Sequence, residues 1–78
     1  MNSDTILVTG ACGQIGTELV LALRKIYKNV IASDLKEPSA ELKEGGEFLR
    51  LDVLYKNGLA DAVKRFGVNQ IYHLAAIL

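Results

Sequence analysis

Three glycines near the amino end are spaced in a way that suits phosphate binding. Gly10, Gly13 and Gly16 follow an apolar run at residues 6–8, within the stretch VTGACGQIG. Gly10 would allow a tight turn, Gly13 would let the backbone approach a pyrophosphate, and Gly16 would let a helix pack close to a strand. Exposed N–H groups at the start of that helix would then face the phosphate charge. The alternative is a plain turn between a strand and a helix, because glycine is common in loops.

Two aspartates follow later apolar runs, where further contacts with a dinucleotide would fall. Asp34 comes 18 residues after Gly16, and a carboxylate there can accept a hydrogen bond from the adenosine ribose 2′-OH and repel a 2′-phosphate. It therefore favours NAD over NADP, although the nearby Lys36 could tolerate the phosphate. Asp52 could accept a hydrogen bond from the adenine amino group, with Val53 against the ring. Each aspartate also suits an ordinary turn.

The other reactive side chains are one cysteine and one histidine. Cys12 lies inside the glycine loop, where the start of a helix could lower its pKa. No base lies near it in the sequence, so we interpret Cys12 as a small loop residue. His73 falls in the last expected strand, where a packed or hydrogen-bonded histidine is expected. With no second histidine, we predict no zinc site and no other metal.

Alternating elements would position these residues. Apolar, β-rich runs predict strands over residues 5–9, 30–33, 48–51 and 70–74. The helical spacing of Ile15, Leu19, Ala22, Leu23 and Ile26 predicts a first helix. It would begin at the glycine loop, place Arg24, Lys25 and Lys28 near its end, and stop at a left-handed Asn29.

A second helix is expected to run up to Phe66, with Asn57 as its cap and Gly67 after its end. The polar loop over residues 36–46 would hold a helical turn near residues 40–43. Strands that alternate with helices form parallel sheets, because parallel neighbours need crossovers. We expect an α/β, Rossmann-like sheet in the order 3-2-1-4, with ligands bound where the carboxyl ends of the strands meet. Those ends carry Gly10, Asp34, Asp52 and Ala75.

The composition excludes several classes of partner. The 78 residues fit one small domain, and nine basic residues balance nine acidic ones without a basic cluster. We therefore predict no nucleic-acid partner. No apolar run approaches the roughly 20 residues that span a bilayer, so no membrane association is expected. The amino terminus lacks the pattern of a signal peptide, and a single cysteine suits a reducing, cytoplasmic setting.

Taken together, the motifs resemble a known family. Residues 9–16, TGACGQIG, together with Asp34, the pair Asp52 and Val53, and HLAA at residues 73–76, match in order the motifs of extended short-chain dehydrogenase/reductases, the NAD-dependent epimerase/dehydratase family. Gln14 and Thr17 resemble the L-threonine 3-dehydrogenase branch more than the sugar-nucleotide enzymes. The resemblance implies NAD as the cofactor. The residues it implies for binding NAD are Gly10, Gly13, Gln14, Ile15 and Gly16 at the pyrophosphate, Asp34 and Leu35 at the ribose, Asp52 and Val53 at the adenine, and Leu74, Ala75 and Ala76 toward the nicotinamide.

The chain departs from that family at its catalytic motif. The family uses a tyrosine as acid or base, with a lysine four residues later that lowers its pKa. The residues four positions after Tyr27, Tyr55 and Tyr72 are Ile31, Leu59 and Ala76. We predict no catalytic residue here, and we expect residues 1–78 to be the amino-terminal part of an NAD-binding domain that is inactive alone. The alternatives are part of a sugar-nucleotide epimerase or dehydratase, or a non-catalytic nucleotide-binding module that self-associates through its fourth strand.

Overall fold

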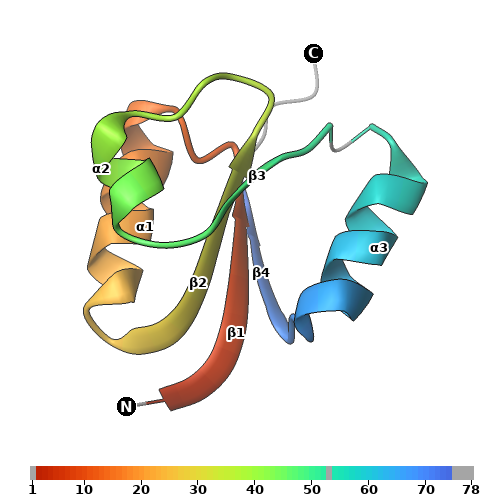
Figure 1. Ribbon diagram of the computed structural model, residues 1–78, viewed down its shortest axis with the longest axis horizontal. Helices are drawn as coiled ribbons and strands as arrows, with labels where there is room; N and C mark the ends of the chain where they lie inside the picture. The colour runs from red at the N-terminus through yellow and green to blue at the C-terminus, as the bar shows by residue number, and fades with distance from the viewer. Residues whose placement is uncertain (1, 53, 75–78) are drawn as a thin grey trace.

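The computed structural model describes residues 2–52 and 54–74. Within them, strands and helices alternate as predicted, and the strands form one parallel sheet in the order β3-β2-β1-β4. The α/β, Rossmann-like arrangement is therefore confirmed (Figure 1). The elements are β1 (Asn2–Thr9), α1 (Gln14–Arg24), β2 (Tyr27–Asp34), α2 (Ala40–Glu44), β3 (Phe48–Arg50), α3 (Lys56–Phe66) and β4 (Gln70–His73).

The main apolar core lies between the sheet and the helices α1 and α2, which cover one face, while α3 covers the other (Figure 1). Successive side chains of a strand point to opposite faces. Ile6 and Val8 of β1 therefore face this core, and Leu7 points to the side that α3 occupies. All three are fully buried, as expected for a strand covered on both faces. The core cluster consists of Ile6, Val8, Ala11, Val20, Leu23, Val30, Ala32 and Leu42.

The strand register brings the carboxyl ends of the strands level with one another. Thr9, the last residue of β1, pairs with Ser33 of β2 and with His73 of β4. Asp34, the last residue of β2, pairs with Arg50, the last residue of β3. The segments that leave the strands therefore emerge along one edge of the sheet, as the sequence predicts.

The first helix ends earlier than its apolar period predicts. α1 stops at Arg24, and the predicted left-handed end at Asn29 is wrong, since no described residue other than glycine has a positive φ. The reason is a contact with β1: Tyr27 pairs with Asn2, so the chain must already be extended there. Ile26, which the helical period places on the buried face, is 60% exposed.

The last helix begins earlier than predicted. Its N-cap is Tyr55, and Asn57, the predicted cap, lies inside the first turn. Asp52 starts the turn, because its carbonyl accepts a hydrogen bond from the Tyr55 amide at 3.0 Å and its Oδ1 accepts one from the Leu54 amide at 2.9 Å. The predicted end is confirmed, since Gly67 has a left-handed φ of 65°.

Candidate functional site

The loop between β1 and α1 is held firmly against the end of β2. Gly10 has a φ of 69°, a left-handed conformation that turns the chain and that favours glycine. The Ala11 amide then donates to the Ser33 carbonyl at 3.0 Å, and the Thr17 hydroxyl donates to the Ala11 carbonyl at 2.8 Å. The loop backbone is thus tied both to the sheet and to its own helix.

The structure requires glycine at one of the other two glycine positions of the loop but not at the other. A Cβ on Gly16 would lie 2.8 Å from the Ala11 Cα, so this position leaves no room for a side chain. The close approach predicted for Gly16 is therefore present, although its neighbour is the loop backbone and not the strand. A Cβ on Gly13 would meet only the Gly10 carbonyl oxygen, at an ordinary 3.7 Å, and Gly13 has an extended backbone with φ −72°. Nothing in the described part of the chain requires glycine at position 13.

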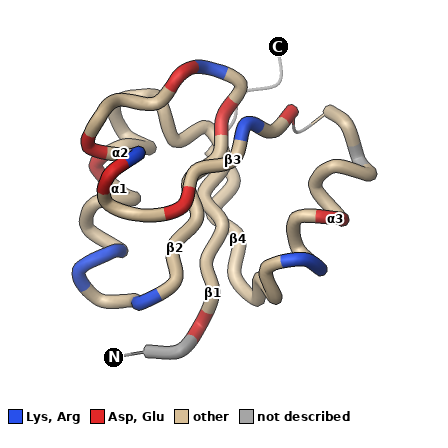
Figure 2. Tube along the Cα trace, viewed as in Figure 1, with Lys and Arg blue, Asp and Glu red and all other residues tan. Residues whose placement is uncertain are grey.

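The amino end of α1 is left open to an anion. Gly13 is its N-cap and offers no side chain, and no acidic residue lies in the first turn. Residues 5–17 carry no charged side chain of their own (Figure 2), and the backbone dipoles of α1 favour negative charge at this end of the helix. By contrast, α2 has the Ser39 hydroxyl on the Leu42 amide and Glu41 in its first turn. The first-turn amides of α1 therefore remain available to a negatively charged ligand.

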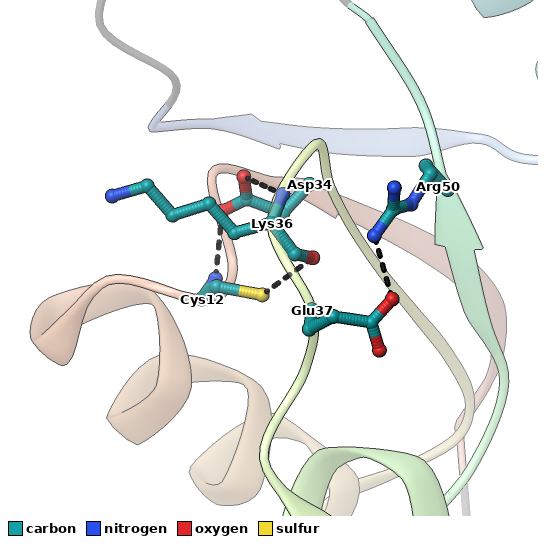
Figure 3. Close-up of polar contacts among 5 residues, drawn as sticks. All are labelled: Cys12, Asp34, Lys36, Glu37 and Arg50. Carbon is teal, nitrogen blue, oxygen red and sulfur yellow. Dashed lines mark hydrogen bonds and ion pairs between the residues drawn. The ribbon is translucent and has the colours of Figure 1, made fainter.

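Asp34 connects the end of β2 to the glycine loop (Figure 3). Its Oδ2 accepts a hydrogen bond from the Cys12 amide at 2.9 Å, and its Oδ1 accepts one from the Lys36 amide at 3.1 Å. Partial burial on its own would raise the pKa of Asp34, but the bonds from the backbone amides, that of Cys12 first, outweigh it and lower the pKa. The side chain is therefore a carboxylate at neutral pH, as an acceptor for ribose hydroxyls must be.

The environment of Cys12 does not activate its thiol. Burial raises the pKa of Cys12, and the neighbouring Asp34 carboxylate raises it further. The sulfur lies 3.4 Å from the Lys36 carbonyl oxygen and donates its proton to it. The lowering of the pKa that the start of α1 could produce is not present, and the interpretation of Cys12 as a loop residue agrees with this environment.

The ends of the remaining strands join the same edge. The Thr9 hydroxyl and His73 Nδ1 lie 2.8 Å apart in a hydrogen bond, as expected for a hydrogen-bonded histidine. The Leu74 amide donates to the Thr9 carbonyl at 3.2 Å, which places Leu74 beside the glycine loop. The Leu51 amide donates a hydrogen bond to the Asp34 carbonyl at 3.1 Å. This bond holds the segment after β3, which contains Asp52, beside the end of β2.

The predicted binding residues are mostly accessible at this edge. Ile15 is 74% exposed, and Gln14, Leu35, Asp52 and Leu74 are exposed as well. Apolar side chains so exposed beside an open helix end are available to a ligand. Val53, Ala75 and Ala76, also predicted to bind, lie outside the described residues.

A hollow lies at the opposite end of the sheet. It measures about 420 Å³, and none of the predicted binding residues lines it. Arg24 lies at its wall and donates to the carbonyls of Leu42, at 3.1 Å, and Glu47, at 3.3 Å. Burial lowers the pKa of Arg24, and its Nε is buried without a partner among the described residues. The sequence did not predict this bridge from α1 to α2 and to the loop before β3, because the pattern indicates only a cation near a helix end.

Neither a metal centre nor a membrane span is found in the part of the chain that the structure describes. No group of three or more His, Cys, Asp or Glu side chains there could hold a metal ion. None of the described helices has the length and apolar character needed to cross a membrane.

Comparison with known proteins agrees with the geometry. Residues 6–78 match the NAD-dependent epimerase/dehydratase family. The chain belongs to this family. An uncharacterized epimerase/dehydratase of Staphylococcus aureus is 43% identical over 76 residues, which cover 94% of this chain but 24% of that relative. The present chain thus spans about a quarter of the length of the curated relatives it matches.

Two solved structures bear on the branch of the family. L-threonine dehydrogenase from Clostridium difficile is 42% identical to this chain, with a TM-score of 0.88. The match covers all of this chain and 25% of the Clostridium protein. MoeE5, solved with UDP-glucuronic acid and NAD, is 36% identical, with a TM-score of 0.74, over 94% of this chain and 23% of that one. Both share the amino-terminal fold, and the threonine enzyme is the more similar of the two.

Proposed function

We propose that this chain binds NAD along the carboxyl edge of its sheet. The observation that carries the proposal is Gly13. Gly10 needs its positive φ and Gly16 has no room for a Cβ, but the described fold places no such demand on Gly13. A pyrophosphate approaching the backbone at the open end of α1 would explain a glycine there.

The remaining contacts follow from the same edge. The first-turn amides of α1 at Gln14, Ile15 and Gly16 would hold the pyrophosphate. Asp34 would accept the ribose hydroxyls, with Leu35 beside it. Asp52 and Val53 would contact the adenine, and Leu74, Ala75 and Ala76 would lie toward the nicotinamide. NAD supplies a hydride acceptor when it is bound, and the chain's own residues would hold and orient it.

We further propose that the chain is the amino-terminal, cofactor-binding share of an L-threonine 3-dehydrogenase. The higher similarity to the threonine enzyme supports this over a sugar-nucleotide epimerase or dehydratase, as do Gln14 and Thr17 in the glycine loop. The reaction would move a hydride from the hydroxyl-bearing carbon of threonine to NAD⁺ and yield 2-amino-3-ketobutyrate. A cytoplasmic setting belongs to this proposal.

The chain by itself is expected to be inactive. No tyrosine in it is followed four residues later by a lysine, so the acid or base that would take the hydroxyl proton is missing. Purified chain mixed with threonine and NAD⁺ should produce no NADH above a buffer control. Sustained NADH production would show that this part of the proposal is wrong.

An NMR titration with NAD⁺ locates the site. Amide signals of Gly10, Gly13 and Gly16 should shift and saturate together, because these amides lie along the proposed pyrophosphate seat. The amides of Gly45 and Gly46, at the hollow near Arg24, serve as the internal control and should stay in place. Shifts confined to the hollow, or no shifts at all, would refute the proposed site.

A second candidate function is self-association through β4. This strand lies at one edge of the described sheet, and its Ile71 is 47% exposed. A free strand edge beside apolar side chains favours pairing with another chain. Sedimentation over a wide range of concentration tests this candidate: a mass that rises with concentration supports it, and a constant monomer mass rejects it.

A further inference from the structure

A second acidic residue near Asp34 is engaged with a cation. Glu37 Oε1 lies 2.6 Å from Nη2 of Arg50 in an ion pair that joins the loop after β2 to the end of β3. Arg50 is the register partner of Asp34, so the pair lies one strand away from the proposed ribose acceptor. Figure 3 shows the Arg50 guanidinium directed at Glu37 and the Lys36 ammonium directed away from both.

The charges at this end of the site are balanced. Acidic and basic residues alternate along the segment that leaves β2, at Asp34, Lys36 and Glu37, and Arg50 adds a second positive charge from the end of β3 (Figure 2). The paired side chains are accessible, with Arg50 58% and Glu37 75% exposed. A ligand group arriving here would therefore meet both partners of the ion pair from the solvent.

NAD and NADP differ in what they require at this place. The 2′-OH of NAD needs a hydrogen-bond acceptor, which Asp34 supplies. The 2′-phosphate of NADP needs a cation, and arginine is the side chain that best accommodates it. Arg50 pairs with Asp34 in the register of the neighbouring strand, but one of its donors is already held by Glu37. The phosphate would have to compete with that carboxylate and approach its negative charge.

We propose that Glu37 is a second determinant of cofactor choice, which discriminates against NADP by occupying Arg50. Asp34 acts directly through the ribose hydroxyl, and Glu37 acts through the arginine. The inference rests on the proposed NAD site. It adds a specificity residue, Glu37, that contacts the Arg50 guanidinium instead of the ribose 2′-OH. Because the pair is exposed, its effect should weaken at high salt.

The test is a calorimetric titration of NAD⁺ and NADP⁺ into the wild-type chain and four variants. Glu37→Gln should bind NADP⁺ about three- to fivefold more tightly than wild type, the scale of an exposed ion pair that no longer has to be broken. Its affinity for NAD⁺ should not change. The double variant Glu37→Gln/Arg50→Gln should bind NADP⁺ with the affinity of wild type. Arg50→Gln alone should also bind NADP⁺ as wild type does. Glu44→Gln, the same charge change at the far end of α2, is the matched control and should have no effect.

The outcomes separate this inference from the proposed function. If wild type prefers NAD⁺ but Glu37→Gln leaves NADP⁺ affinity unchanged, only the role of Glu37 is refuted. If the gain persists when Arg50 is also replaced, the effect is a general change in charge, and the role of the ion pair is refuted. If wild type binds neither nucleotide, both the proposed function and the inference fail.

Discussion

Replacing Gly16 by alanine would add a methyl group where the structure has no room for one. The new Cβ would lie 2.8 Å from the Ala11 Cα and 3.1 Å from the Ala11 carbonyl carbon. Both atoms are backbone, and two hydrogen bonds, from the Ala11 amide to Ser33 and from Thr17 to Ala11, hold that backbone in place. The loop cannot give way without weakening them.

The expected cost follows from two opposing terms. Forcing an extra carbon into a packed site costs about 1–3 kcal/mol. Alanine recovers up to about 1 kcal/mol of helix propensity over glycine. Because the added Cβ meets backbone atoms closer than 3.0 Å, the cost falls in the upper part of its range, about 2–3 kcal/mol. Gly16→Ala should therefore lower the free energy of unfolding by about 1–2 kcal/mol, a large fraction of the stability of a domain this small.

Urea denaturation followed by circular dichroism measures the change. Gly13→Ser is the matched control, since it also adds a side chain to the loop but meets only an ordinary contact. Serine is a good N-cap, so this variant should be as stable as wild type or a few tenths of a kcal/mol more stable, roughly. If Gly16→Ala is as stable as wild type, or if Gly13→Ser loses more stability than Gly16→Ala, the assigned packing of the loop is wrong.

Three further outcomes are expected. Arg24→Lys should lower the free energy of unfolding by about 1–2 kcal/mol, because a single lysine nitrogen does not replace the two guanidinium nitrogens that bond the Leu42 and Glu47 carbonyls. Unchanged stability in urea would argue against the bridge. Cys12 should react with iodoacetamide more slowly than a free thiol near neutral pH and faster as pH rises, because its pKa is raised; mass spectrometry showing a faster reaction than glutathione would contradict this. The pKa of Asp34 is lower folded than unfolded, so its stabilising contribution is present above about pH 4 and lost as pH falls below it. The difference in free energy of unfolding between wild type and Asp34→Asn should therefore shrink in acid. A difference that stays constant with pH would refute a stabilising role for the Asp34 carboxylate.

The arrangement of the sheet could be predicted because local patterns determine it. Short β-rich runs alternate with helical periods, and this alternation leads to parallel pairing and the order β3-β2-β1-β4. Gly10 could be placed in a tight turn, and Gly67 after the end of a helix, because each follows the end of an apolar run, and both have a positive φ in the structure. These signals lie within a few residues of the feature they predict.

The features that could not be predicted depend on distant partners. Ile26 fits the helical period, yet the pairing of Tyr27 with Asn2 ends the helix before it. The bond from the Cys12 amide to Asp34 and the ion pair of Glu37 with Arg50 join residues 22 and 13 positions apart. No spacing rule links such residues, because only the folded sheet brings their strands together.

Calorimetric titration of NAD⁺ into the wild-type chain and into Gly13→Ser tests most directly whether the glycine loop seats the cofactor. Because Gly13→Ser should fold as well as wild type, a change in affinity reports on the site and not on stability. We expect saturable binding at one site per chain in wild type, and binding weaker by about tenfold or more, roughly 1.4 kcal/mol, in the variant. No binding by the wild-type chain, or equal affinity in both proteins, would contradict the proposed seat for NAD.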